Sequence, residues 1–252
     1  IDAWKEGKDL ILLSPTGSGK TLAYLLPLLE SLNPEIKGVQ AIVLVPSREL
    51  ALQIDQVFKS MNTSYKVMSC YGGRPAMEEH RTMKGIEPSV IIGTPGRMND
   101  HLSKQNFDAT TVRTLIIDEF QNFLSINKSI PSSIQDVWDR YKDRSHVNLI
   151  LCGSIYSMMK KIFENGDEPL YGRRDSSMRL LPFSIDTLKK ILVDHHPAYA
   201  PDDLLCLYML TGGVAKYVAL LMDAGATTKH KMLKCALAPD SPFLTEGTEL
   251  LV

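Results

Sequence analysis

The sequence contains few of the features that mark zinc-binding, secreted or membrane proteins. Its four cysteines lie far apart, at positions 70, 152, 206 and 235, without a C-x-x-C pair or a matching histidine spacing. This pattern disfavours zinc sites and disulfide frameworks, and it favours buried thiols in a reducing, cytoplasmic environment. Every apolar run is shorter than the roughly 18 residues that a membrane-spanning helix requires, so we expect no membrane contact.

The chain also lacks an excess of either charge, with 28 Lys and Arg residues against 29 Asp and Glu residues. Bulk charge therefore gives no reason to expect nucleic acid, and any such contact must come from a few placed side chains. The 44% hydrophobic and 23% charged content is that of a globular protein and excludes disorder and fibrous repeats. The sequence starts without Met and ends without a cap, so we expect a fragment of a longer protein.

Short apolar runs alternate with amphipathic stretches along most of the chain. We predict buried strands at residues 10–13, 41–45, 67–70, 90–92, 115–117, 149–152 and 180–183. Apolar residues at helical spacing predict helices across residues 50–61 and 134–141, the second starting at Pro131. From residue 185 onward we expect helices only. The pattern predicts a parallel α/β sheet flanked by helices over residues 1–184 and a small, truncated helical appendage over residues 185–252.

The strongest motif is S-P-T-G-S-G-K-T at residues 14–21, which follows the first predicted strand and opens a helix. Glycines allow a tight turn that points backbone N–H groups inward, and the helix N-terminus favours bound phosphate. Ser14 stands at the usual first glycine, and an ordinary glycine-serine turn is the alternative interpretation. The motif is typical of a P-loop NTPase, and ATP is expected to bind at Thr16, Gly17, Ser18, Gly19, Lys20 and Thr21.

A second motif, the acidic pair at residues 118–119, follows the strand predicted at residues 115–117. There Asp118 is expected to hold Mg²⁺ together with the Thr21 hydroxyl, and Glu119 to polarise the attacking water. Lys20 is expected to supply a point charge for the β- and γ-phosphates. Acidic residues commonly end strands, but the pairing with a phosphate loop predicts Mg-ATP binding and hydrolysis.

Residues up to about 120 resemble the first RecA-like domain of DEAD-box RNA helicases. The resemblance rests on the phosphate loop, P-S-R-E-L-A at residues 46–51, G-G at 72–73 and T-P-G-R at 94–97. It implies weak, sequence-independent contacts with the backbone of single-stranded RNA at Arg48, Gly73, Thr94 and Arg97, and guanidinium forks and loop amides suit phosphate oxygens. Taken singly, Arg48 also fits a surface charge at a helix start, G-G a plain turn, and T-P-G-R a helix entry with Pro in its first turn.

From about residue 115 the chain resembles a different group, the archaeal-type P-loop ATPases related to signal-transducing (STAND) NTPases. D-E-F-Q at residues 118–121 and C-G-S at 152–154 replace the D-E-A-D and S-A-T strings of DEAD-box proteins, and T-G-G-V-A-K-Y at 211–217 fits the second group. The resemblance implies that Ser154 senses the γ-phosphate. Arg173 or Arg174 is a candidate arginine finger, against the alternative of a solvated basic turn. The two resemblances together imply a RecA/AAA-like parallel sheet in a hybrid chain. Such a hybrid could arise by natural fusion, by deliberate recombination or by an assembly error.

Three functions fit these motifs. The first is an ATP-hydrolysing domain with a DEAD-box RNA face, incomplete as a helicase because the sequence lacks the H-R-x-G-R-x-x-R string of the second RecA-like domain. The second is a regulatory archaeal-type ATPase acting on a protein partner through the helical appendage. The third is a hybrid that binds nucleotide without turning it over, since catalysis tolerates only about an ångström of misplacement.

Overall fold

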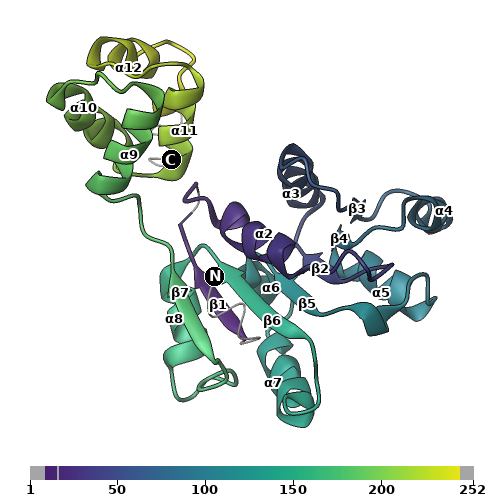
Figure 1. Ribbon diagram of the computed structural model, residues 1–252. Helices are drawn as coiled ribbons and strands as arrows, with labels where there is room; N and C mark the ends of the chain where they lie inside the picture. Colours follow the sequence, from purple (N-terminus) through teal and green to yellow (C-terminus); the bar gives the residue numbers. More distant parts are fainter. Residues whose placement is uncertain (1–8, 16, 245–252) are drawn as a thin grey trace. The chain divides into compact units, whose positions relative to one another are not determined.

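The computed structural model describes residues 9–15 and 17–244, and these divide into two compact units (Figure 1). The first unit holds residues 9–15 and 20–179, and the second holds residues 17–19 and 180–244. The domain boundary predicted at residue 184 stays a prediction, although the contacts within the described chain divide near residue 179.

The first unit is built on one parallel sheet of seven strands. In spatial order the strands are β3 (Val67–Cys70), β4 (Val90–Gly93), β2 (Ala41–Leu44), β5 (Thr114–Ile117), β6 (Asn148–Gly153), β1 (Leu10–Leu13) and β7 (Ser176–Arg179). The predicted parallel α/β sheet is confirmed, and six of the seven predicted runs form strands at or within two residues of the expected bounds.

The seventh predicted run is wrong. The edge strand is β7, the polar segment S-S-M-R, and the apolar residues 180–183 follow it outside any strand. An edge strand pairs on one side only and is half exposed here, so it needs no continuous apolar run. Phe183 instead packs against the core of the second unit, where its N–H donates to the carbonyl of Gly213 at 2.7 Å.

Helices connect the strands of the first unit. They are α2 (Lys20–Ser31), α3 (Arg48–Ser60), α4 (Ala76–Ile86), α5 (Pro95–Ser103), the short 3-10 helix η1 (Ala109–Thr111), α6 (Phe120–Ile126), α7 (Ile130–Tyr141) and α8 (Tyr156–Glu164). The two helices predicted at residues 50–61 and 134–141 are confirmed as α3 and α7. Pro131 is the second residue of α7, where a missing N–H costs nothing.

Both faces of the sheet are covered, because alternate residues of each strand point to opposite sides. Ile11 and Leu151 pack in one cluster with Phe163 of α8. On the same face, Met83 of α4 and Met98 of α5 belong to a second cluster over the β2–β4 side. On the other face α3 packs against β3 and β4, and α2 packs against α3. Double coverage explains why all residues of β1 and β4 are buried.

Parallel strands end at the same edge of a sheet, and this edge positions the site. The segments that follow β1, β2, β3, β4, β5 and β6 therefore emerge side by side. They carry every predicted nucleotide and RNA residue of the first unit. In open α/β sheets, ligands bind outside these carboxyl ends.

Among its described residues, the second unit has helices and no strand after residue 184, as the sequence predicts. They are α9 (Ile185–His195), α10 (Pro201–Thr211), α11 (Ala215–Asp223) and α12 (Lys229–Ala236). Each contributes a fully buried side chain to one apolar cluster: Leu188, Leu207, Leu221 and Met232. The second unit therefore has a core of its own.

The four cysteines carry no disulfide, and Cys70, Cys152 and Cys206 are buried while Cys235 is half-buried. The predicted buried thiols are thus found at three of the four positions. Among the described residues, no helix has the length and apolar character needed to cross a membrane.

Candidate nucleotide site and nucleic-acid interface

Two glycines of the phosphate-loop motif, in the segment between β1 and α2, have the backbone conformation of a tight turn. Gly17 and Gly19 adopt left-handed conformations with φ of 77° and 86°, which side chains disfavour. Ser18 lies between them, and Thr16, also predicted to bind nucleotide, lies outside the described residues. At the start of the motif, the Ser14 N–H donates to the Gly153 carbonyl at 3.1 Å, which ties the end of β1 to the end of β6.

Lys20 and Thr21 open α2, where the first N–H groups of a helix lack partners within the helix. The Lys20 ammonium lies 2.9 Å from Asp118 Oδ1 and also pairs with Glu119 Oε1. Burial lowers the pKa of Lys20, but the charges of the two carboxylates outweigh burial and leave this pKa raised. The arrangement holds a cation between Asp118 and Glu119.

Glu119 is the centre of a side-chain network at the end of β5. The Ser154 hydroxyl donates to Glu119 Oε2 at 2.6 Å, and the Gln121 amide donates to the same carboxylate and to Ser154 Oγ. Burial raises the pKa of Glu119, but the hydrogen bonds from Lys20 and Ser154 outweigh burial and lower it overall. The three predicted catalytic residues Lys20, Glu119 and Ser154 are thus in contact, with Glu119 ionised.

Two residues of this site escaped the sequence interpretation. Gln121 was named only as part of the D-E-F-Q string that departs from D-E-A-D and resembles the archaeal-type group, yet its amide joins Glu119 to Ser154. There is no room beside it for a side chain at Gly153, because a Cβ there would lie 2.5 Å from Met159 and 2.8 Å from the Gln121 oxygen. A glycine at the end of β6 therefore allows Ser154 to reach the network.

Tyr24 is the other missed residue. Its hydroxyl donates to Asp118 Oδ2 at 3.1 Å and is hydrogen-bonded to the Thr21 side chain. Burial, followed by the charge of Asp118, raises the pKa of Tyr24 well above its ordinary value, so the hydroxyl keeps its proton. The available signal was its spacing of three residues from Thr21 and four from Lys20, which places all three on one helix face.

The predicted RNA residues gather where β2, β3 and β4 end. Arg48 opens α3, and its guanidinium carbon lies 4.9 Å from the centroid of the Tyr71 ring. Gly73 has φ of 94°, and the next residue, Arg74, returns to within 5.2 Å of the same centroid. Arg74 was not predicted; its position directly after the G-G pair was the signal.

Arg97 and Thr94 belong to the start of α5. Arg97 Nη1 donates to Glu79 Oε2 at 2.8 Å and Nη2 donates to the Arg74 carbonyl at 2.6 Å. Its side chain is only 11% exposed. Thr94 is the N-cap residue of α5 but makes no side-chain cap bond, and its N–H donates to the Cys70 carbonyl at 3.0 Å.

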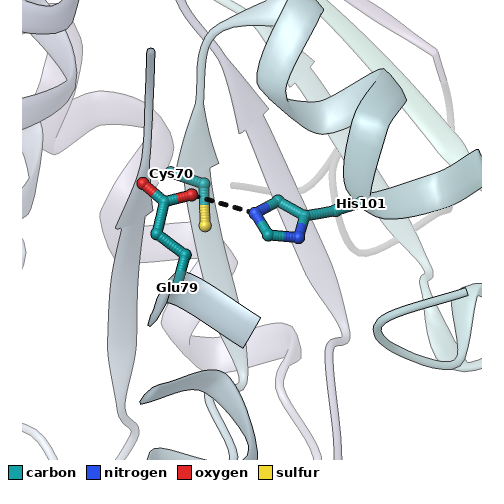
Figure 2. A group of neighbouring side chains, drawn as sticks. All are labelled: Cys70, Glu79 and His101. Atoms are coloured by element: carbon teal, nitrogen blue, oxygen red, sulfur yellow. Dashed lines mark hydrogen bonds and ion pairs between the residues drawn. The ribbon is translucent and has the colours of Figure 1, made fainter. Parts of the chain in front are cut away.

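Beside Arg97, the potential metal ligands of Cys70, Glu79 and His101 lie within 4.8 Å of one another (Figure 2). Burial, followed by the charge of Glu79, raises the pKa of the Cys70 thiol to about 12, so without a bound metal ion the thiol keeps its proton at neutral pH. Glu79 accepts hydrogen bonds from Arg97 and from His101 Nε2, while Asn106 bonds His101 Nδ1 at 2.8 Å. The cluster works as a hydrogen-bond network.

The two candidate arginine fingers are engaged within their own unit. Arg173 makes two 2.8 Å bonds to the carboxylate of Asp139 on α7, and Arg174 lies 3.4 Å from Glu164 on α8. A role at a neighbouring nucleotide stays a prediction.

Residues 1–154, more than half of the chain, match the family described as DEAD/DEAH box helicase. The chain belongs to this family. The match includes residues 115–154, so the D-E-F-Q strand end and Ser154 lie within the DEAD/DEAH segment and not beyond a seam at residue 115. The likeness of the later residues to archaeal-type ATPases stays a prediction.

RNA helicases of bacteria are among the curated relatives of this chain. DEAD-box ATP-dependent RNA helicase CshA of Bacillus licheniformis is 34% identical over 161 residues, which cover 62% of this chain and 32% of the relative. ATP-dependent RNA helicase DeaD of Escherichia coli K12 is 38% identical over 121 residues, covering 47% of this chain and 19% of the relative. The chain thus spans a third or less of these relatives.

Solved structures share the fold. Mss116p bound to ssRNA and AMP-PNP has a TM-score of 0.54 and 25% identity over 69% of this chain and 36% of that chain. A DEAD box protein from Methanococcus jannaschii has a TM-score of 0.53 and 22% identity over 75% of this chain and 53% of that chain. Together they show a RecA-like α/β fold.

Proposed function

We propose that this chain is a Mg-dependent ATPase domain whose turnover is stimulated by single-stranded RNA, and that it does not unwind RNA alone. The observation that carries the proposal is the Lys20 cation held between Asp118 and Glu119. The arginines around Tyr71 follow other strands at the same edge of the sheet. Membership of the DEAD/DEAH box helicase family, and relatives named as ATP-dependent RNA helicases, support both the ATPase activity and its stimulation by RNA.

The residues around Lys20 fit Mg-ATP. Oxygen ligands are those that Mg²⁺ prefers, and Asp118 and Thr21 present a carboxylate and a hydroxyl that are both bonded to Tyr24. The carboxylate pair already accepts one positive charge, the Lys20 ammonium. When bound, Mg²⁺ would neutralise charge on the β- and γ-phosphates. Lys20 would then exchange its carboxylate partners for phosphate oxygens.

Glu119 would act on the attacking water. Its lowered pKa keeps it ionised at neutral pH, so it can accept a hydrogen bond from the water and orient its lone pair. Ser154 and Gln121 hold the Glu119 carboxylate from one side. Arrival of a γ-phosphate would give the Ser154 hydroxyl a competing acceptor, which fits the predicted sensing role.

The test is the ATPase rate of the purified chain with and without single-stranded RNA. We expect RNA to raise the rate by at least about tenfold, which corresponds to about 1.4 kcal/mol in the barrier. RNA binding is expected to weaken steeply with salt, because few contacts other than phosphate pairs contribute. Equal turnover with and without RNA, together with no RNA retention at low salt, would rule out the RNA part of the proposal.

Equal turnover with and without RNA, together with no RNA retention, would favour a regulatory ATPase that acts on a protein partner. One observation supports this candidate: the helical unit has its own core, yet α10 exposes Leu205 at 56% and Met209 at 74%. Exposed apolar side chains on one helix suit a protein contact. In this reading the later residues keep the predicted archaeal-type likeness, and assembly driven by ATP would depend on Arg173 or Arg174.

Replacing Tyr24 with Phe is expected to raise the Mg²⁺ concentration for half-maximal ATPase by about tenfold, as loss of a residue bonded to metal ligands commonly does. The rate at saturating Mg²⁺ should change little, because Tyr24 does not face the reacting atoms. Mg²⁺ titration of the ATPase rate measures this shift. Tyr65→Phe is the matched control, since among the described residues its hydroxyl donates only to the Leu32 carbonyl. An equal Mg²⁺ requirement in both variants contradicts the role.

A further inference from the structure

Strand β3 is an edge strand of the sheet and pairs with β4 only (Figure 1). Successive residues of a strand turn their backbone N–H and C=O groups to opposite sides, so every second residue bonds to a given neighbour. The Thr94 N–H donates to the Cys70 carbonyl at 3.0 Å, so Cys70 and Met68 turn their backbone groups toward β4. The backbone groups of Val67 and Ser69 therefore point to the open side of β3, where the described residues provide no further strand.

The open side of β3 has the features of an edge that can pair. Its sequence, V-M-S-C, contains neither a charge nor a proline, two features that commonly keep a sheet edge from pairing. Tyr71, the next residue that turns outward, has its N–H bonded to the Glu79 side chain at 3.4 Å. Val67 and Ser69 have no backbone hydrogen bond on this side within the described ranges. Such an edge is a template for an added strand, because it presents backbone donors and acceptors at strand spacing.

A groove of about 360 Å³ lies along this edge, between α3 and α4. Its lining includes Leu52 and Asp55 of α3, Ser69 of β3, and Thr82 and Ile86 of α4. Three of the four residues of β3 are buried although it is an edge strand, so the edge is recessed between the two helices. A recess admits a single extended chain. It excludes the β3 edge of a second copy, because the α3 and α4 helices of the two copies would collide first.

Two polar side-chain atoms of this groove, Asp55 Oδ1 and Ser69 Oγ, have no hydrogen-bond partner among the described residues. Asp55 is 6% exposed, and only its other carboxylate oxygen is paired, with the Lys59 ammonium. Met68 and Cys70 belong to the cluster on the α4 face of the sheet, so Ser69 points to the α3 face, which carries Asp55. A buried acceptor without a donor is costly, and a hydroxyl group placed between α3 and β3 would supply the donor.

We propose that the β3 edge binds an extended segment of another protein, which adds a strand to the sheet in the groove between α3 and α4. The backbone of the segment pairs with Val67 and Ser69. A serine or threonine of the segment directs its hydroxyl to Asp55, and its neighbour, which faces the α4 side, is apolar and meets Ile86. The proposal requires neither ATP nor RNA, so it goes beyond the proposed function and stands or fails separately from it.

The first experiment follows amide hydrogen exchange in β3 by NMR, with and without the peptide K-V-T-V-T-V-K at up to about 1 mM. In the free chain the amides of Val67 and Ser69 are expected to exchange faster than those of Met68 and Cys70, which point to β4. The peptide should slow exchange at Val67 and Ser69 several-fold, because an added strand pairs with these two residues. The control is the same peptide with its five central residues N-methylated, which removes their backbone donors.

The second experiment tests the hydroxyl contact through a cycle between the chain and the peptide. Asp55→Ala should weaken binding of the threonine peptide by about tenfold, as loss of a hydrogen bond to a charged acceptor does. It should change little for K-V-A-V-A-V-K, which lacks the hydroxyls. Asp100→Ala is the matched control, because Asp100 forms the same type of ion pair with a lysine four residues later. Melting temperatures check that each variant is folded, and Asp55→Asn replaces Asp55→Ala if the latter unfolds.

Four results would overturn the proposal. The first is the absence of protection at Val67 and Ser69 with about 1 mM peptide. The second is equal protection by the N-methylated peptide, which would show contact through side chains without an added strand. The third is protection of both amides in the free chain: if it grows with protein concentration, a second copy covers the edge, and if not, another part of the same chain does. The fourth, an equal effect of Asp55→Ala on both peptides, would remove the hydroxyl contact. None of these results bears on ATP turnover or RNA binding.

Discussion

Replacing Glu119 with Gln is expected to lower ATP turnover by about 10²–10⁴-fold, the usual contribution of a positioned general base. Gln has nearly the same size and keeps hydrogen bonds to Ser154 and Gln121, but it cannot accept the proton of the attacking water. ATP affinity should stay within a few-fold, because Lys20 and Asp118, the residues expected to meet the phosphates and Mg²⁺, are unchanged. Loss of turnover with retained binding separates catalysis from folding and from nucleotide recognition.

Single-turnover ATPase rates and nucleotide binding by fluorescence measure this pair of effects. Glu35→Gln is the matched control, since Glu35 is an exposed glutamate after α2 whose loss removes the same charge. Unchanged turnover in Glu119→Gln would contradict its role as the base. If neither the wild type nor Glu119→Gln turns over ATP, the result favours the third function, a chain that binds nucleotide without turning it over.

Replacing Lys20 with Ala is expected to weaken ATP binding by at least about a hundredfold, comparable to the loss of a charge-stabilising donor of about 3 kcal/mol. It removes the cation for the phosphates and leaves Asp118 and Glu119 side by side without a counter-charge. Breaking a buried ion pair in this way should also lower the free energy of unfolding by about 3 kcal/mol at neutral pH.

The pH dependence of this destabilisation follows from Glu119. Its pKa in the folded protein is lowered from an ordinary value of 4.5, so its stabilising contribution is present above pH 4.5 and lost as pH falls through the folded value. In Lys20→Ala two influences that lower this pKa, the hydrogen bond and the charge of Lys20, are gone. The gap in unfolding free energy between wild type and variant should therefore be largest at neutral pH and shrink below about pH 4.5.

Urea unfolding from pH 3 to 7 and equilibrium ATP binding test the Lys20 prediction. Lys37→Ala serves as the control, because Lys37 is exposed in the loop before β2 and its replacement removes the same charge. A gap that stays constant across this pH range would show that Lys20 stabilises the fold by packing and not by pairing with the carboxylates.

Much of the first unit was predictable from local pattern. Buried parallel strands are apolar on both faces, so β1 to β6 stand out as short apolar runs. The exception is instructive: β7 is polar because it lies at the sheet edge, and the neighbouring apolar residues 180–183 were chosen in its place. The apolar content of a segment predicts that it is buried. It does not predict whether a neighbouring strand or a packed helix buries it.

The site divides in the same way. Lys20, Asp118 and Glu119 were predictable because phosphate and metal chemistry restrict the residue types that can follow particular strands. Tyr24, Gln121 and Arg74 have side chains that serve equally well in a core, a helix or a solvated turn. Nothing in their local sequence distinguishes these uses.

By itself the sequence determined the strand and helix order, the phosphate loop with its acidic partner, and the resemblance to DEAD-box helicases. Each of these rests on short local patterns governed by backbone geometry or by phosphate chemistry. Only the tertiary structure decided that Gln121 joins Glu119 to Ser154 and that Glu79 holds Arg97 beneath Arg74. Parallel strands bring their carboxyl ends together from distant points of the chain, and the contacts made there depend on three-dimensional packing.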